Sequence, residues 1–116
     1  SIYLNNFGNH ERDVTDIDDV TNMLVKLTLK KNKGHKVFNI SSNNPINIKN
    51  IINNFTKSRN IKLKKIEKNK ADMLKTHGDN KKILNYLNIK LNKNFEKNFL
   101  NTFNWYSKNY KNKHIN

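Results

Sequence analysis

The spacing of apolar residues in the first third of the chain predicts a strand followed by a helix. Residues 2–4 form a short apolar run typical of a strand, and the asparagine-rich residues 5–10 after it contain Gly8 and predict a turn. The next apolar positions step by three, four and three residues, which places them on one helix face: Ile17, Val20, Leu24 and Leu27. Thr15 or Asp16 is expected to cap this helix.

The middle of the chain predicts a second strand, a second helix and an edge strand. Residues 36–40 (KVFNI) are rich in β-forming side chains, which indicates a short buried strand. Pro45 stands where it can start a helix whose apolar positions have the spacing i, i+3, i+4 and i+7: Ile48, Ile51, Ile52 and Phe55. Residues 61–66 (IKLKKI) alternate apolar and charged positions at their start, which predicts an exposed edge strand.

Two helices are predicted in the last third, a short one near residues 80–87 and a long one near residues 94–111. The long helix carries aromatic side chains at three- and four-residue spacing: Phe95, Phe99, Phe103, Tyr106 and Tyr110. Such a stripe can stack on nucleobases, but at helical spacing it more often packs against a core, and we favour the core interpretation.

Together these elements predict an α/β fold without a domain boundary or an internal repeat. The chain has 116 residues, 34% of them hydrophobic, a formal net charge of +14 and a mean hydropathy of −0.94. A weakly apolar, self-repelling chain of this length offsets its conformational entropy poorly, so we do not expect it to be stable alone. The chain begins with Ser1 rather than methionine, so we expect further sequence before it.

Cysteine usage and hydropathy limit the cellular setting. The chain contains no cysteine, which excludes disulfides and thiolate metal sites and fits a reducing compartment. No apolar run approaches the roughly 20 residues that span a bilayer, and the first residues lack the pattern of a signal peptide. We therefore expect a soluble, cytoplasmic protein that does not associate with a membrane.

The high positive charge suggests a small basic nucleic-acid-binding module as one possible function. Clustered lysine and arginine side chains bind phosphate backbones by releasing counterions. The lysines here are spread along the chain, however, and asparagine is used as heavily as lysine. A bias of the whole composition explains both residues, so nucleic-acid binding is kept as the alternative interpretation.

Two further patterns have the spacing of known chemistry together with a simpler explanation, whereas the histidines show no such spacing. Asp16 and Asp18 match the Asp-x-Asp pattern that holds a metal in many glycosyltransferases, but a helix start accounts for both acids. Tyr86 and Lys90 match the Tyr-x-x-x-Lys pair of short-chain dehydrogenases, yet they stand at the end of a short predicted helix. The histidines at positions 10, 35, 77 and 114 lack metal-ligand spacing, and most are expected at the surface.

Arg12 is unusual because the chain otherwise relies on lysine for positive charge. Only Arg12 and Arg59 are arginine among the 23 basic residues, and Arg12 is surrounded by acids. It follows a glycine turn and precedes a helix start, an arrangement that suits a diphosphate because a guanidinium bonds two phosphate oxygens at once. A structural salt bridge to a neighbouring aspartate explains the spacing equally well.

The residues around Arg12 resemble a motif of the extended short-chain dehydrogenase/reductase family of nucleotide-sugar epimerases, and UDP-glucuronate 4-epimerases most of all. The segment IYLNNFGNHERDVTDIDDV is similar to the family pattern Tyr-Asn-x-Gly-x-x-x-Arg-Asp-Phe-Thr-Tyr-Ile-Asp-Asp-Val. VFNISSNNPINI resembles its Tyr-Asn-Ile-Gly-x-x-x-Pro-Val-x-Leu, and residues 68–110 resemble Gln-Pro-Gly-Asp-Val-x-x-Thr-Tyr-Ala-Asp, two helices and a closing Phe-x-x-Trp-Tyr. The matches cover almost the whole chain in order. The positions of the first motif that agree are Gly8, Arg12, Asp13, Thr15, Ile17, Asp18, Asp19 and Val20.

This resemblance implies that residues 1–116 are the C-terminal, substrate-binding part of such an enzyme, with an incomplete Rossmann domain. In the family an N-terminal part holds NAD on a glycine-rich turn and carries the catalytic Tyr-x-x-x-Lys. The three glycines of this chain, Gly8, Gly34 and Gly78, cannot form that turn, and no convincing catalytic pair is present. NAD would therefore be bound by the absent N-terminal part, and the full-length enzyme is expected to be a homodimer.

The resemblance also implies roles for five residues. Arg12 would hold the diphosphate of a UDP sugar, and Asp72 would bond the ribose hydroxyls. Thr76 lies at a position near the sugar, and Asn5 and Asn6 occupy the stretch that lines the base. The implied function is an NAD-dependent 4-epimerase, acting on UDP-glucuronate or a similar sugar for surface polysaccharide.

Several positions depart from the family pattern. Asp16 stands where the family has Tyr or His, so that its carboxylate could compete for the Arg12 guanidinium. Asn69 stands where many relatives have a second phosphate-binding arginine. Ala71 replaces the glycine before Asp72, and the His77-Gly78 pair replaces Tyr-Ala. We expect the site to be altered relative to that of the family.

Overall fold

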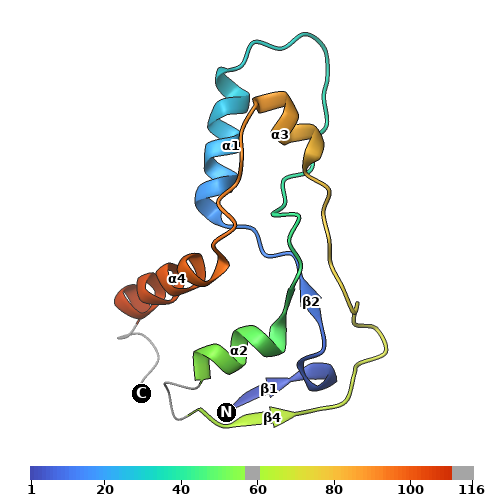
Figure 1. Ribbon diagram of the computed structural model, residues 1–116, viewed down its shortest axis with the longest axis vertical. Helices are drawn as coiled ribbons and strands as arrows, with labels where there is room; N and C mark the ends of the chain where they lie inside the picture. The colour runs from blue at the N-terminus through green and yellow to red at the C-terminus, as the bar shows by residue number, and fades with distance from the viewer. Residues whose placement is uncertain (57–60, 111–116) are drawn as a thin grey trace.

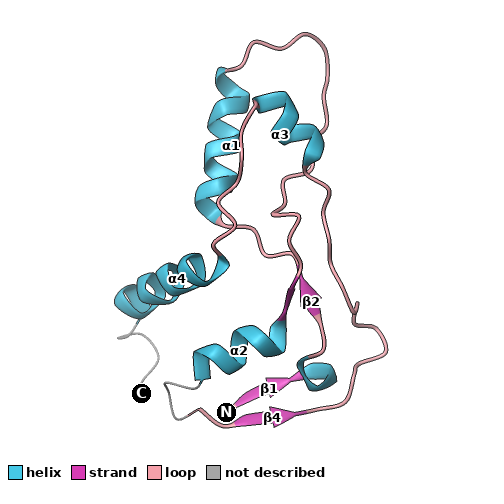
Figure 2. Ribbon diagram, in the orientation of Figure 1, coloured by secondary structure: helices cyan, strands magenta, loops and turns pink. Residues whose placement is uncertain are grey.

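The computed structural model describes residues 1–56 and 61–110 and shows helices combined with two small sheets (Figures 1 and 2). The α/β prediction is confirmed at this level. The elements in chain order are β1 (Ile2–Leu4), the 3-10 turn η1 (Asn5–Gly8), β2 (Glu11–Arg12), α1 (Ile17–Leu29), β3 (Ile46–Asn47), α2 (Ile48–Thr56), β4 (Leu63–Lys65), α3 (Lys81–Leu87) and α4 (Phe95–Tyr110).

The two sheets have two strands each and join segments far apart in the sequence. β1 pairs with β4 in parallel, with Ile2 opposite Leu63, which confirms both the first strand and the predicted edge strand. β2 pairs antiparallel with β3, with Arg12 opposite Ile46. In Figure 1, α2 lies beside the β1–β4 pair at one end of the molecule, while α1 and α3 lie side by side at the other end.

Helix α1 begins as the sequence predicts, and the predicted face is covered in part, because Val20 and Leu27 are partly buried. The Asp16 side chain accepts a hydrogen bond from the Asp18 backbone N–H (2.9 Å), so Asp16 is the N-cap. Met23 is fully buried, whereas Ile17 and Leu24 of the predicted face are 67% and 48% exposed. α3 contacts α1, and the covered positions Val20, Met23 and Leu27 form a stripe that shares two positions with the predicted one.

The strand predicted at residues 36–40 is not formed. These residues lie along α3, where the Phe38 ring packs 5.0 Å from the Tyr86 ring and Lys82 Nζ donates to the Val37 carbonyl (2.8 Å). β-forming side chains make a strand only where a neighbouring strand offers its hydrogen-bonding edge, and here α3 occupies that side. The prediction was wrong because sequence propensity does not supply a partner.

Two other boundaries differ in detail. Pro45 does not start a helix, because β3 comes between Pro45 and α2. The short helix near 80–87 and the long helix near 94–111 are confirmed as α3 and α4. None of the described helices is both long and apolar enough to pass through a bilayer.

The aromatic stripe of α4 is divided between packing and exposure. Phe99 and Phe103 approach the Phe55 ring of α2 at 5.5 and 4.8 Å, and all three are partly buried. Tyr106 and Tyr110 stack on each other at 4.8 Å but remain 54% and 38% exposed. The stripe therefore packs as predicted along its first half, and the prediction was wrong for its second half.

Candidate functional site

β2 fixes the backbone of the candidate site between two other segments. On one side it pairs with β3, and on the other the Glu11 N–H donates to the Leu74 carbonyl (2.9 Å) while the Thr76 N–H donates to the Glu11 carbonyl (3.1 Å). A strand with neighbours on both edges has little freedom to shift in register. Arg12 therefore leaves the backbone at a position set by three segments that are distant in the sequence.

The Arg12 guanidinium forms an ion pair with Asp72, sixty residues away along the chain. Nη2 donates to Asp72 Oδ1 at 2.9 Å, and Nη1 donates to the Glu11 carbonyl at 2.9 Å. Both ionic side chains remain partly accessible, with 28% and 30% exposed. A guanidinium has five N–H donors, so these two bonds leave donors for a ligand.

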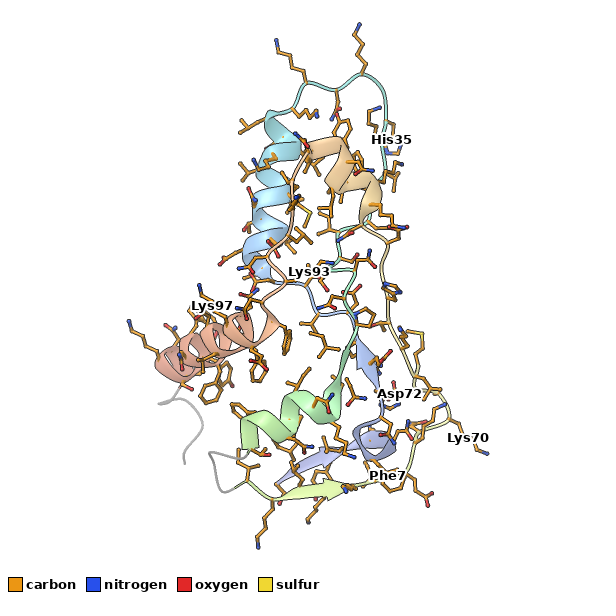
Figure 3. The ribbon with its side chains drawn as sticks, in the orientation of Figure 1. Phe7, His35, Lys70, Asp72, Lys93 and Lys97 are labelled. Atoms are coloured by element: carbon orange, nitrogen blue, oxygen red, sulfur yellow. The ribbon has the colours of Figure 1, made fainter. Side chains whose placement is uncertain are left out.

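The acids next to Arg12 in the sequence have other roles. Asp16 caps α1, and Asp13 bonds to residues of two loops, so neither competes for the guanidinium in the way its position suggested. The alternative prediction, a salt bridge to a neighbouring aspartate, is replaced by the pair with Asp72. Figure 3 shows Asp72 beside β2.

Arg12 and Asp72 line a cavity of about 220 Å³ at the end of the molecule where β1 and α2 meet. Asn5 also lines it, so three of the five residues for which the resemblance implies a binding role lie around one space. Asn6 and Thr76 are not among the lining residues. The full lining consists of Tyr3, Leu4, Asn5, Gly8, His10, Arg12, Ile48 and Asp72.

The turn η1 shapes one wall of this cavity through unusual backbone angles. Asn6 and Phe7 have φ angles of 48° and 55°, in the left-handed region that asparagine tolerates better than most residues. Gly8 follows with a φ of 83°, and a Cβ at this position would lie 2.9 Å from Lys49 Cβ. Glycine is required here for both reasons, which explains its place in the motif.

Thr76 supports the site indirectly. Its Oγ1 accepts a hydrogen bond from the Asp13 backbone N–H (3.0 Å), directly after Arg12. Thr76 holds the end of β2 in place.

Asp13 is the centre of a polar junction that the sequence analysis did not single out. Oδ1 accepts from the Ser42 hydroxyl and the Asn44 N–H (3.4 Å), and Oδ2 accepts from the Gly78 N–H (2.8 Å). Burial raises the pKa of the Asp13 carboxyl, but these hydrogen bonds together outweigh burial, so its pKa is lowered from 3.8. One carboxylate thus joins β2 to two loops.

His10 is the second residue that sequence reasoning missed, because most histidines were expected at the surface. His10 is only 4% exposed and lines the cavity beside Arg12. Its Nδ1 atom lies 3.5 Å from Asp72 Oδ2. His10 and Arg12 are two positions apart, and alternate residues of an extended segment share a face. This two-residue spacing was the signal in the sequence that could have placed His10 beside Arg12. Of the other histidines, His35 and His77 are exposed, and position 114 lies outside the described residues.

A second, more apolar cavity of about 290 Å³ separates the start of α1 from α4. Asp19 lies at its edge, where burial raises the pKa of its carboxyl, the nearby Asp16 and Asp18 charges raise it further, and a hydrogen bond from the Asn92 backbone opposes them. Within residues 1–56 and 61–110 no three acids or histidines gather as metal ligands. Asp16 and Asp18 are thus placed by the helix start.

The Tyr86–Lys90 pattern falls on α3 and the loop that follows it. The Tyr86 ring packs against Phe38, and Lys30 Nζ lies 4.3 Å from its centroid. These contacts give Tyr86 a packing role.

Figure 3 also shows that Lys70, on the loop near Asp72, and Lys93 and Lys97, near the start of α4, lie on different parts of the surface.

Comparison with known proteins gives one relative. The chain is 30% identical over 106 residues to an uncharacterized protein, MJ1055, of Methanocaldococcus jannaschii. The match covers 90% of this chain and 32% of that protein, so the chain spans about a third of the length of the curated relative it matches. No protein-family model and no solved structure matches the chain.

Proposed function

We propose that this chain is the substrate-binding part of an NAD-dependent nucleotide-sugar epimerase and that the Arg12–Asp72 cavity binds a UDP sugar. UDP-glucuronate is the substrate that the sequence resemblance favours. The observation that supports the proposal is the meeting of Asn5, Arg12 and Asp72, from separate segments, around one cavity. NAD, held by an N-terminal part of the enzyme, would supply reversible hydride transfer to the sugar.

The charges of the cavity suit a ribose diphosphate. Arg12 offers donors in a planar fork that matches phosphate oxygens, and its ion pair with Asp72 fixes the plane of that fork. Each oxygen of the Asp72 carboxylate can accept more than one hydrogen bond, so Asp72 can hold Arg12 and still accept from a hydroxyl. An acceptor beside a guanidinium is the pairing that a ribose next to a diphosphate requires.

The size of the cavity fits one part of a larger site. Complete small-molecule sites have volumes of roughly 300–1,000 Å³, whereas this cavity has about 220 Å³. We propose that it receives the ribose diphosphate and that the N-terminal part of the enzyme completes the walls around the sugar. The substrate would then lie between the two parts, which is a common position for ligand sites.

The test is calorimetric titration of the protein, as its gene encodes it, with UDP and UDP-glucuronate at fixed ionic strength. We expect binding by the unmodified protein and about tenfold weaker binding by Arg12→Lys, because a point charge cannot replace two parallel hydrogen bonds. Lys81→Gln, which removes an exposed charge from α3, is the matched control and is expected to change affinity less than twofold.

Two results would contradict the proposal. Unchanged affinity in Arg12→Lys would show that Arg12 does not hold the diphosphate. Failure to bind UDP, together with nucleic-acid binding that weakens steeply as salt is added, would favour the basic nucleic-acid-binding module.

A further inference from the structure

His10 occupies a buried position behind the two ionic residues of the cavity. Its backbone carbonyl accepts the Ile48 N–H (2.9 Å), which ties it to the start of α2, and its side chain is 6% exposed. With Arg12 and Asp72 it lines the same cavity. Its position is therefore fixed by the backbone on one side and by the cavity wall on the other.

His10 and Arg12 lie next to opposite oxygens of one carboxylate. Arg12 Nη2 donates to Asp72 Oδ1, and His10 Nδ1 lies 3.5 Å from Oδ2. Because a carboxylate is an acceptor, we assign a proton to Nδ1 on the basis of this neighbour. With a cationic donor at one oxygen and an imidazole N–H at the other, the Asp72 carboxylate has one preferred rotation.

Packing alone does not explain a histidine at position 10. Its Nε2 is buried and has no hydrogen-bond partner among the described residues. A buried polar atom without a partner destabilises the folded protein, so an apolar side chain of similar size would pack at lower cost. The contact with Asp72 is the feature of His10 that an apolar residue could not provide.

We propose that His10 is a positioning residue of the nucleotide site, which orients Asp72 to accept a hydrogen bond from a ribose hydroxyl. This inference rests on the proposed function, because it concerns how the same cavity recognises its ligand. Without His10, Asp72 is held by Arg12 alone and can turn about its Cβ–Cγ bond. The carboxylate then loses the orientation that the hydroxyl requires, while Arg12 keeps its contact with the diphosphate.

The experiment compares two ligands, UDP and 2′,3′-dideoxy-UDP, by calorimetric titration of the same protein. The ratio of their dissociation constants measures how strongly the site recognises the ribose hydroxyls. We expect a ratio of about ten for the unmodified protein and a ratio near one for His10→Leu, which removes the contact that orients the carboxylate, and for Asp72→Ala, which removes the carboxylate itself. The double variant is expected to show no further loss.

His10→Asn and His10→Gln separate positioning from packing. The amide nitrogen of asparagine can take the place of Nδ1 beside Asp72. The ratio of dissociation constants in His10→Asn is therefore expected to stay close to that of the unmodified protein. The amide nitrogen of glutamine reaches toward the place of Nε2 instead. The ratio of dissociation constants is therefore expected to fall to near one in His10→Gln, as in His10→Leu. The glutamine variant also keeps the test decisive if the leucine variant fails to fold.

The outcomes distinguish the two proposals. If the unmodified protein binds UDP and His10→Leu or His10→Gln weakens both ligands equally, His10 has only a packing role and this inference is overturned. If the unmodified protein does not bind UDP at all, the proposed function fails and the role of His10 fails with it.

Discussion

The polar junction around Asp13 and the helical layer of α1, α3 and α4 are held together in opposite ways. The junction joins residues from β2, residues 42–44 and residues 76–78 by hydrogen bonds to one carboxylate. The helical layer carries many of the apolar residues but buries few of them: Ile17, Leu24, Val25, Leu29 and Leu100 are all about half exposed or more. In this chain long-range order comes from polar contacts more than from a hydrophobic core.

This difference indicates which part of the chain leaves its apolar surface uncovered. Among the described residues only Leu4, Met23 and Ile83 are buried hydrophobic residues. The radius of gyration is 17.5 Å, whereas a compact domain of this length has a radius of about 13 Å. The helical layer therefore presents an apolar surface of the kind that a further part of a protein covers, while the junction is already formed.

The largest effect on stability is expected from Asp13→Ala, which removes the acceptor at the centre of the junction. Hydrogen bonds to a charged acceptor contribute roughly 1.5–3 kcal/mol each, so a loss of about 4 kcal/mol in the free energy of unfolding is expected. Chemical denaturation followed by circular dichroism measures it. A loss below about 1 kcal/mol would show that the junction does not hold the fold.

The same carboxylate predicts a dependence of stability on pH. The pKa of Asp13 is lower in the folded chain than its ordinary value of 3.8, so its contribution is present in full above pH 3.8 and is lost as pH falls through the lowered pKa. Asp19, whose pKa is raised, acts in the opposite direction. The free energy of unfolding is measured from pH 6 to pH 2 for the unmodified protein and for Asp13→Asn. Both proteins contain Asp19, so its contribution cancels in the difference. The stability difference should shrink toward the acid end, and a constant difference would contradict the assignment.

A somewhat smaller effect is expected within the helical layer, where burial differs between adjacent residues. Met23→Ala removes a fully buried side chain of α1 and is expected to cost about 3 kcal/mol. Leu24→Ala, its neighbour, removes a side chain that is 48% exposed, so a cost below about 1 kcal/mol is expected. Thermal and chemical denaturation measure both variants. Equal losses of stability in Met23→Ala and Leu24→Ala would show that Leu24 is covered in the intact protein.

The smallest of these effects concerns Gly78 and Ser41, which lie in contact beside the junction. A Cβ at Gly78 would meet Ser41 Cβ and Oγ at 2.5 Å, so Gly78→Ala is expected to destabilise the protein by about 2 kcal/mol. In the epimerase pattern that the sequence resembles, the position of Gly78 has Ala and the position of Ser41 has Gly, so the glycine of the pair stands at the other position. The double variant Ser41→Gly/Gly78→Ala should therefore recover most of the loss. If it does not, the two residues do not compensate each other.

Sequence patterns predicted local structure well where one segment contains all the information. The period of apolar residues located α1, α2 and α4, and the residues before α1 gave Thr15 or Asp16 as its cap, of which the structure has Asp16. The same patterns failed at residues 36–40, because a strand depends on a neighbour that propensity does not identify. They predicted the covered face of α1 only in part, because packing covers Met23 in place of Ile17 and Leu24.

For the candidate site, the sequence by itself determined which residue types were available: one arginine among lysines, acids that cap a helix, and a glycine that permits a left-handed turn. The tertiary structure decided which of them meet. It placed Asp72 against Arg12, buried His10 behind both and made Asp13 the centre of a junction. The physical reason is the separation along the sequence over which each interaction acts. Helix caps and apolar periodicity involve residues a few positions apart, whereas ion pairs and cavities form between segments that only the folded chain brings together.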